Sequence, residues 1–151
     1  GRIMKKVMLM LTVFLAFVLI TGTALSAEMI RIGEQQIVAH PAHDNDSKGF
    51  AAALAEEGFI EGKNITIERQ NAQGEQPNCA IIAQKYLDDN VNLIHAISTP
   101  NAQASVKVAK KIPIVFSSVT DPVKTGIVPK DGKSGSIVRG VSDRWTITSQ
   151  C

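Results

Sequence analysis

The sequence predicts an α/β protein in which helices cover both faces of a parallel sheet. Four apolar segments with strand character begin near residues 30, 64, 91 and 112, and each interval has room for one crossover helix. Their order is therefore β-α-β-α-β-α-β, which is the pattern of a parallel sheet. Two neighbouring strands run into hydroxyl and small polar residues. Strand ends of this kind are where parallel α/β sheets hold ligands.

The first strand is predicted at residues 30–38. A helix is expected from about residue 44 to 57, where apolar side chains recur at helical spacing. Asp44 or Asp46 is expected to cap the start of this helix, and Gly58 suits its end. A turn should follow at residues 61–64.

Residues 64–70 alternate between apolar and polar side chains, which predicts a half-buried second strand. The next helix is expected to open near Pro77, because proline fits a first helical turn. The apolar side chains that share one face of this helix are Cys79, Ile82, Ala83, Tyr86 and Leu87. We expect that face to pack on the sheet.

The third strand is predicted at residues 91–97, the third helix at 101–110 and the fourth strand at 112–116. Glycine, lysine and proline are frequent over residues 123–136, which indicates a loop. Residues 137–141 are a candidate for a short further strand. The organisation predicted for the chain is a signal peptide at 1–27, an α/β lobe at 28–143 and an irregular tail at 144–151.

The N-terminus has the order of an export signal. Two lysines precede an apolar run over residues 7–20, and small residues follow up to Ala27. A membrane span needs about 20 apolar residues, so the run is more typical of a cleaved signal than of an anchor, which stays the alternative. Cleavage is expected after Ser26 or Ala27, which predicts an exported, periplasmic protein. Residues 1–3 precede the first methionine and are not counted as native.

The charge of the chain gives no support to nucleic-acid binding. Three of the 16 basic residues lie in the predicted signal, so 13 basic and 14 acidic side chains remain in the mature chain. No run of basic residues interleaved with aromatic ones is present. Cys79 and Cys151 are expected to be unpaired thiols, although an oxidising compartment would permit a disulfide.

Eight short segments between residues 30 and 143 occur in the order and spacing of one family. They are 36–41 (QIVAHP), 48–50 (KGF), 58–64 (GFIEGKN), 70–74 (QNAQG), 98–104 (STPNAQA), 112–116 (IPIVF), 119–123 (VTDPV) and 140–143 (GVSD). On these segments the chain resembles the tryptophan/tyrosine-type periplasmic substrate-binding proteins of ABC transporters. That resemblance implies the type I periplasmic binding-protein fold.

The resemblance also implies a function. Such proteins bind a small zwitterionic solute, such as an aromatic amino acid, between two α/β lobes, and the closed form docks on an ABC permease in the inner membrane. Family members are about twice as long as this chain, which corresponds to their N-terminal lobe only. A truncated or fragment form is therefore expected. The alternatives are a fragment without function and a flavodoxin-like periplasmic domain with an enzymatic or regulatory role.

The residues expected to bind the ligand lie at the carboxyl ends of the predicted strands. They are His40, Pro41, Ser98, Thr99, Asn101, Ala102, Ser118, Val119, Thr120 and Asp121. The group from Ser98 to Ala102 opens a helix and would bind a carboxylate, partly through the backbone N–H of Ala102. Asp121 would pair with an ammonium group, and His40 and Pro41 would form a wall.

Simpler roles are open for several of these residues. Ser98 and Thr99 could only cap a helix, and Asp121 could only shape the turn before Pro122. Gln70 and its neighbours in the turn after the second strand could likewise serve the turn alone.

We predict that the chain is not an enzyme and that it binds neither a cofactor nor a metal ion. The three histidines have no plausible base–nucleophile spacing. Two histidines and two aspartates lie within residues 40–46, but Pro41 restricts that segment and the aspartates have capping roles available. A GKS sequence at 132–134 lacks the glycine that a phosphate-binding loop needs at position 127, where Ile127 stands.

Overall fold

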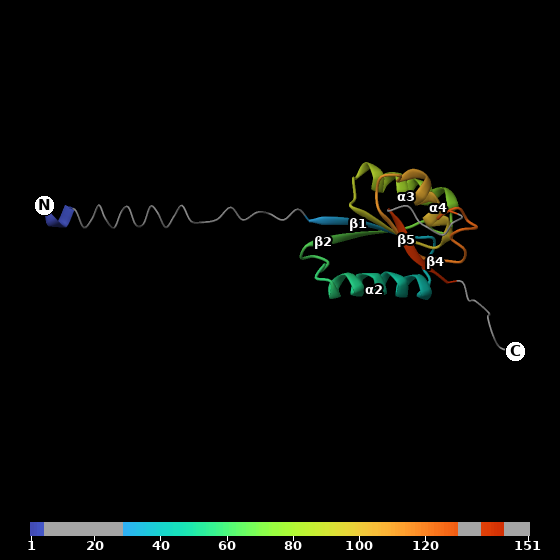
Figure 1. The fold of residues 1–151 in the computed structure, drawn as a ribbon, viewed down its shortest axis with the longest axis horizontal. Coiled ribbons are helices and arrows are strands. Elements are labelled where there is room, and N and C mark those ends of the chain that lie inside the picture. Colours follow the sequence, from blue (N-terminus) through green and yellow to red (C-terminus); the bar gives the residue numbers. More distant parts are fainter. Residues whose placement is uncertain (5–28, 130–136, 144–151) are drawn as a thin grey trace.

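The computed structural model describes residues 1–4, 29–129 and 137–143. Its centre is a five-stranded parallel sheet of order β2-β1-β3-β4-β5. The elements are β1 (Ile30–Gln36), α2 (Pro41–Glu56), β2 (Ile65–Asn71), α3 (Gln76–Asp88), β3 (Leu93–Ile97), α4 (Thr99–Val108), β4 (Ile114–Val119) and β5 (Val138–Ser142). Helix α2 lies on one face of the sheet, and α3 and α4 lie on the other (Figure 1). The predicted α/β fold with helices on both faces is confirmed.

All strands run in the same direction, so their carboxyl ends meet at one edge, on the right in Figure 1. At this edge Gln36 of β1 pairs with Asn71 of β2 and with Ile97 of β3. Ile97 in turn pairs with Ser117 of β4. The residues that follow β1, β2, β3 and β4 are therefore gathered in one place.

Helix α2 begins earlier than the sequence predicts. His40 has extended backbone angles, and its Nδ1 accepts a hydrogen bond from the backbone N–H of Ala42 at 3.2 Å. The expectation that Asp44 or Asp46 caps this helix is wrong, because the Asp44 N–H already donates to His40 O within the first turn. Pro41 lacks an N–H and therefore fits this turn without loss. At the other end Gly58 has φ +87°, as the predicted helix end requires.

Strand β4 continues past the predicted end at Phe116. Ser117 keeps the pairing with β3, and an irregularity in the register to β5 lies between Phe116 and Val119. Helix α4 starts at Thr99 rather than Asn101, with Pro100 in its first turn. The predicted short strand near 137–141 is present as β5.

The main apolar core lies between the sheet and helices α3 and α4. Four of the five residues predicted for the inner face of α3 are buried, and Leu87 is partly buried. The ring of Tyr86 lies against Gly33, where a Cβ atom would come within 2.6 Å of it. The Tyr86 hydroxyl lies 2.6 Å from Glu34 O and 2.9 Å from Glu68 O. Burial raises the pKa of this hydroxyl, so it stays protonated as a donor.

Some predictions fall on residues without a described position. Cys79 is buried in α3 and makes no disulfide, whereas Cys151 lies outside the described residues. Residues 5–27 of the predicted signal, much of the predicted loop and the predicted tail at 144–151 lie outside them as well. Within the described residues, no helix has the length and apolar character needed to cross a bilayer.

Candidate functional site

The ends of β3 and β4 lie side by side and carry unusual backbone angles. The Ser98 N–H donates to Ser117 O at 2.9 Å. Ser98 has φ +89° and ψ 156°, and Ser118 has φ +51°. Left-handed angles in residues other than glycine cost about 1–3 kcal/mol each and concentrate at binding and catalytic sites. The two strained serines coincide with the two segments that the sequence singles out for ligand binding.

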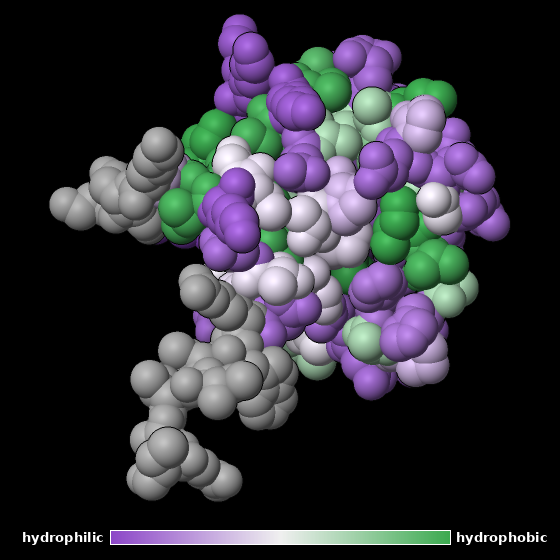
Figure 2. Space-filling model, turned by 90° about the vertical axis from the view of Figure 1, so that its right-hand side faces the viewer, coloured by the Kyte–Doolittle hydropathy of each residue, from purple (hydrophilic) through white to green (hydrophobic). Residues whose placement is uncertain are grey.

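Figure 2 looks onto the carboxyl edge of the sheet. Residues of intermediate hydropathy occupy the centre of this face, and strongly polar and apolar residues alternate around them. The centre of this face therefore carries no continuous apolar patch.

The start of α4 lies at this edge with a backbone donor that the helix does not use. The first N–H groups of a helix have no acceptor within it, which applies here to Thr99 and Asn101. Of these two residues only Thr99 is partly exposed, so its N–H is the donor that a ligand can reach. The Ala102 N–H, in contrast, donates to Ser98 O at 3.1 Å, so in this structure the helix uses the donor expected to meet a carboxylate. The Ser98 side chain does not cap the helix; its Oγ accepts from Asn101 Nδ2 at 3.3 Å. Asn101 is fully buried, and its Oδ1 has no partner within the described part.

Ser118 makes a contact that the sequence did not indicate. Its hydroxyl lies 2.6 Å from Oδ2 of Asp46, which reaches it from α2. Both residues are half-buried. The sequence assigned Asp46 to helix capping, and no local pattern could show that α2 crosses the end of β4.

The remaining predicted residues, at the last position of β4 and just after it, contact the segments that follow the strand. Val119 is fully buried, and its carbonyl accepts from the Asp143 N–H. Thr120 is exposed, and its carbonyl accepts from Ser142 Oγ at 3.0 Å. Asp121 Oδ1 accepts from the Lys124 N–H at 3.0 Å, so its carboxylate holds a turn, as the simpler reading of this residue proposed.

The predicted wall residues His40 and Pro41 begin α2, and both are exposed. The His40 and His43 rings lie 5.7 Å apart, and His43 Nδ1 is 3.1 Å from Val38 O. In the described ranges, no three His, Cys, Asp or Glu side chains are arranged to hold a metal ion.

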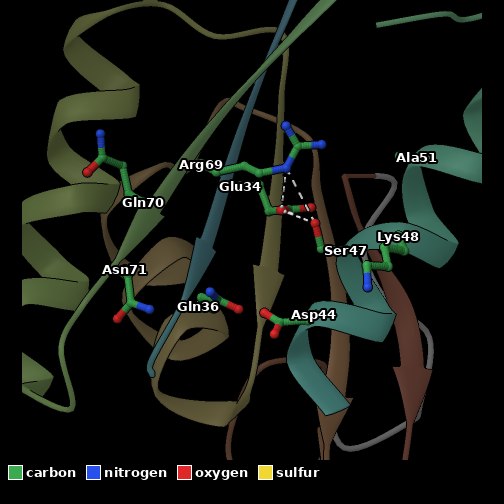
Figure 3. A pocket seen from close by; sticks show the side chains of 9 residues that line it. All are labelled: Glu34, Gln36, Asp44, Ser47, Lys48, Ala51, Arg69, Gln70 and Asn71. Atoms are coloured by element: carbon green, nitrogen blue, oxygen red, sulfur yellow. Dashed lines mark hydrogen bonds and ion pairs between the residues drawn. The ribbon is translucent and has the colours of Figure 1, made fainter. Parts of the chain in front are cut away.

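A cavity of about 410 Å³ lies between α2 and the carboxyl halves of β1 and β2. It is lined by Glu34, Gln36, Asp44, Ser47, Lys48, Ala51, Arg69, Gln70 and Asn71, and none of the ten predicted ligand residues lines it. Figure 3 shows these side chains, with Glu34, Ser47 and Arg69 joined by hydrogen bonds and ion pairs at one end. Asn71 Oδ1 accepts from the Gln73 N–H at 2.8 Å and thus shapes the turn.

A buried polar network forms the floor of this region. Glu34 Oε2 accepts from His95 Nδ1 at 2.9 Å, and Glu34 Oε1 accepts from Ser47 Oγ at 2.5 Å. Arg69 Nε lies 3.3 Å from the same oxygen, and its two terminal nitrogens contact Glu61. Burial by itself would raise the pKa of Glu34. The hydrogen bonds from His95 and Ser47 outweigh that effect and hold the pKa below its usual range.

Ser117, His95 and Glu34 have the bonding order of a nucleophile, its base and an orienting acid. His95 Nε2 lies 3.0 Å from Ser117 Oγ. However, the exposed fractions are 8% for Ser117, 1% for His95 and 3% for Glu34. The ring of Phe50 also stacks on His95 at a centroid distance of 4.1 Å. A substrate cannot reach this triplet, which instead ties β1, β3 and β4 together under α2.

This network was not predicted from the sequence, although the sequence carries a signal for it. Glu34 and His95 stand within strands that helices cover on both sides. A charged group in such a position must have a partner, because burial without one is costly. The sequence could therefore have shown that partners exist, but not which residues they are.

A family model described as ABC transporter substrate binding protein matches residues 31–151. This chain belongs to the ABC transporter substrate-binding protein family. A tyrosine-binding protein of Clostridioides difficile (strain R20291) is 45% identical over 122 residues, which cover 81% of this chain and 35% of that protein.

Solved structures agree with this assignment to the substrate-binding protein family. A ligand-free, open substrate-binding protein with adhesive properties from Clostridium difficile has a TM-score of 0.75 at 44% identity, over 79% of this chain and 40% of that one. An ABC domain in complex with L-Trp from Streptococcus pneumoniae has a TM-score of 0.72 at 32% identity, over 78% and 39%. The chain thus spans well under half of each relative, which is consistent with one lobe.

Proposed function

We propose that this substrate-binding protein is the ligand-binding lobe of an ABC importer's exported receptor. Its ligand is a small zwitterionic solute such as an aromatic amino acid. Export to the periplasm and delivery to a permease in the inner membrane are parts of this proposal. They are supported by the signal-like N-terminus and by the family to which the chain belongs.

The observation that carries the proposal is the pair of strained serines at the carboxyl edge of the sheet. Ser98 and Ser118 hold left-handed angles at adjacent strand ends, where the N–H of the partly exposed Thr99 has no acceptor within α4. Donors fixed in this way can bind a carboxylate without further ordering. Two relatives that cover most of this chain are named for tyrosine binding or were solved with L-Trp.

In this proposal the carboxyl edge of the sheet contacts one side of the ligand, and this lobe makes no contact with the other side. The exposed large apolar side chains of the described surface lie at scattered positions. None of these side chains lines the cavity beside α2. In the proposed function, contacts to an aromatic ring come from a second lobe, and closure of the lobes around the ligand is a population shift driven by those contacts.

The test is a calorimetric titration of the purified chain with tyrosine, tryptophan, phenylalanine and aspartate. Saturable binding of aromatic amino acids, even in the millimolar range, supports the proposal. A folded chain that gives no heat with any of them contradicts ligand binding by this chain.

A matched pair of variants tests whether the start of α4 is the site. Thr99→Pro removes one free N–H at the first helical position, where proline is tolerated. Gln76→Pro makes the same change at the first position of α3, which is likewise followed by a proline. Weaker binding is expected for Thr99→Pro only. Equal effects of the two variants would place the ligand elsewhere.

A further inference from the structure

Helix α2 contacts the end of β4 at this edge through Asp46 and Ser118. Asp46 Oδ2 and Ser118 Oγ lie 2.6 Å apart, and Ser118 has the left-handed angle φ +51°. We propose that Asp46 and Ser118 together bind the ammonium group of the ligand. This inference rests on the proposed function and deepens it, because it names the residues that recognise one charged end of the zwitterion.

The direction of the hydrogen bond decides what Ser118 can bind. An ionised carboxylate can only accept hydrogen bonds, so Ser118 must donate its single hydroxyl proton to Asp46. Ser118 Oγ can then only accept further hydrogen bonds, through its lone pairs. In this state Ser118 is an acceptor, which suits an N–H donor and repels a carboxylate.

The Asp46 carboxylate also has capacity left for a cation. Among the described acidic residues, Glu34, Glu61, Glu68 and Asp89 form ion pairs with Arg, Lys or His, whereas Asp46 does not. Within the same part of the chain, its contact to Ser118 occupies only Oδ2. A half-buried carboxylate with a free oxygen favours a charge-assisted hydrogen bond from an ammonium group.

The position of this pair fits the two charged groups of an α-amino acid. The N–H of the partly exposed Thr99, which has no acceptor within α4, follows β3, and Ser118 lies next to the last residue of the adjacent strand β4. Neighbouring strands are about 4.8 Å apart. A carboxylate at the start of α4 therefore leaves an ammonium group on the same carbon close to Ser118.

This assignment replaces the one made from the sequence. Asp121 was expected to pair with the ammonium group, but its Oδ1 accepts from the Lys124 N–H in the loop after β4. Asp46 lies in α2, and it reaches the carboxyl edge of the sheet only because the tertiary fold places α2 across the end of β4.

The test compares three ligands on the full chain. L-Tyrosine carries both charged groups, tyramine only the ammonium group, and 3-(4-hydroxyphenyl)propanoate only the carboxylate; the corresponding tryptophan compounds form a second series. Asp46→Asn keeps the size of the side chain and removes its charge. It is expected to weaken binding of the amino acid about tenfold or more and to leave the propanoate unchanged. Asp121→Asn is the matched control and should change neither.

A second variant distinguishes a lost ligand contact from a folding defect. Ser118→Gly removes the hydroxyl and suits φ +51°, so it should fold and should also weaken binding of the amino acid selectively. If both variants bind as the wild type does, or if Asp121→Asn shows the loss, the inference is overturned and the proposed function stands. If the wild type binds no compound of either series, both are overturned.

Discussion

The two faces of the sheet carry different kinds of buried side chain. Towards α3 and α4 the sheet presents apolar side chains, among them Ile94, Ile114 and Phe116, which pack in the larger core cluster around Tyr86. Towards α2 the buried apolar set is small, with Ile32, Ile65 and Ile67 at its centre. Partly buried apolar side chains such as Phe50 and Leu54 pack against this set, and the polar network lies on the same face. The same strands therefore carry a large apolar core on one side and buried charges on the other.

The difference indicates that the α2 face fixes how the strand ends are placed relative to one another. Apolar burial stabilises without specifying direction, whereas each hydrogen bond of the network fixes one atom against another. The network runs from Ser117 in β4 through His95 and Glu34 to Arg69 in β2. Ser117 stands next to the strained Ser118, so the α2 face holds the end of β4 where the proposed ligand site needs it. The face with α3 and α4 holds most of the buried apolar residues in the two core clusters.

The largest expected effect comes from breaking the buried pair. Replacing His95 by leucine leaves the Glu34 carboxylate buried with weaker partners, and we expect a loss of about 3–5 kcal/mol in the free energy of unfolding. Urea denaturation of the two proteins measures this loss directly.

A double-mutant cycle separates the pair from simple packing. The variant Glu34→Leu/His95→Leu should lose less than the sum of the two single variants, because no uncompensated charge remains buried. Additive losses would mean that the α2 face behaves like the apolar face, and would contradict the distinction between them.

The next largest effect tests packing on the opposite face. Gly33→Ala places a Cβ atom 2.6 Å from the buried Tyr86 ring, and we expect it to destabilise by about 1–3 kcal/mol. Gly49→Ala is the matched control in α2, where nothing lies within 4 Å of the added atom. That change should stabilise by about 0.5–1 kcal/mol through helix propensity. Thermal melts of both variants give the signs, and a loss in each would contradict this account.

The sequence predicted the fold well because its signals are local. Strand spacing, the inner face of α3 and the weak strand β5 all follow from the periodicity of short segments. Errors arose at element ends, where His40 rather than an aspartate caps α2 and β4 continues to Val119.

The candidate site was predicted only in part, for a physical reason. The serines at the ends of β3 and β4 are visible in the sequence because polar residues follow apolar strands there. The contact of Asp46 with Ser118 joins residues 72 positions apart, and the pair of Glu34 with His95 joins residues 61 apart. Such partners depend on how α2 lies on the sheet, which no short segment encodes.

A smaller effect should distinguish strain from side-chain contacts at Ser98. Ser98→Ala and Ser98→Gly lose the same hydroxyl, but only glycine adopts φ +89° and ψ 156° without strain. We expect the glycine variant to be more stable than the alanine variant by about 1–2 kcal/mol. Urea denaturation of the two variants side by side measures the difference, and equal stability would mean that Ser98 is not strained.

The smallest expected effect concerns acid, and it again separates the two faces. The pKa of Glu34 is held below its usual range in the folded protein, so its contribution to stability is complete near neutral pH. That contribution is lost as the pH falls from about 5 through the folded-state pKa, because the unfolded chain then binds more protons. Glu34→Gln should therefore unfold at lower urea concentration at pH 7 and lose less stability on acidification than the wild type. Ile94→Ala removes buried apolar atoms on the opposite face without changing any charge, so it should lower stability at every pH and keep the wild-type dependence on pH. If both variants lost stability in acid as steeply as the wild type, the exposed carboxylates and not the buried network would govern the acid response.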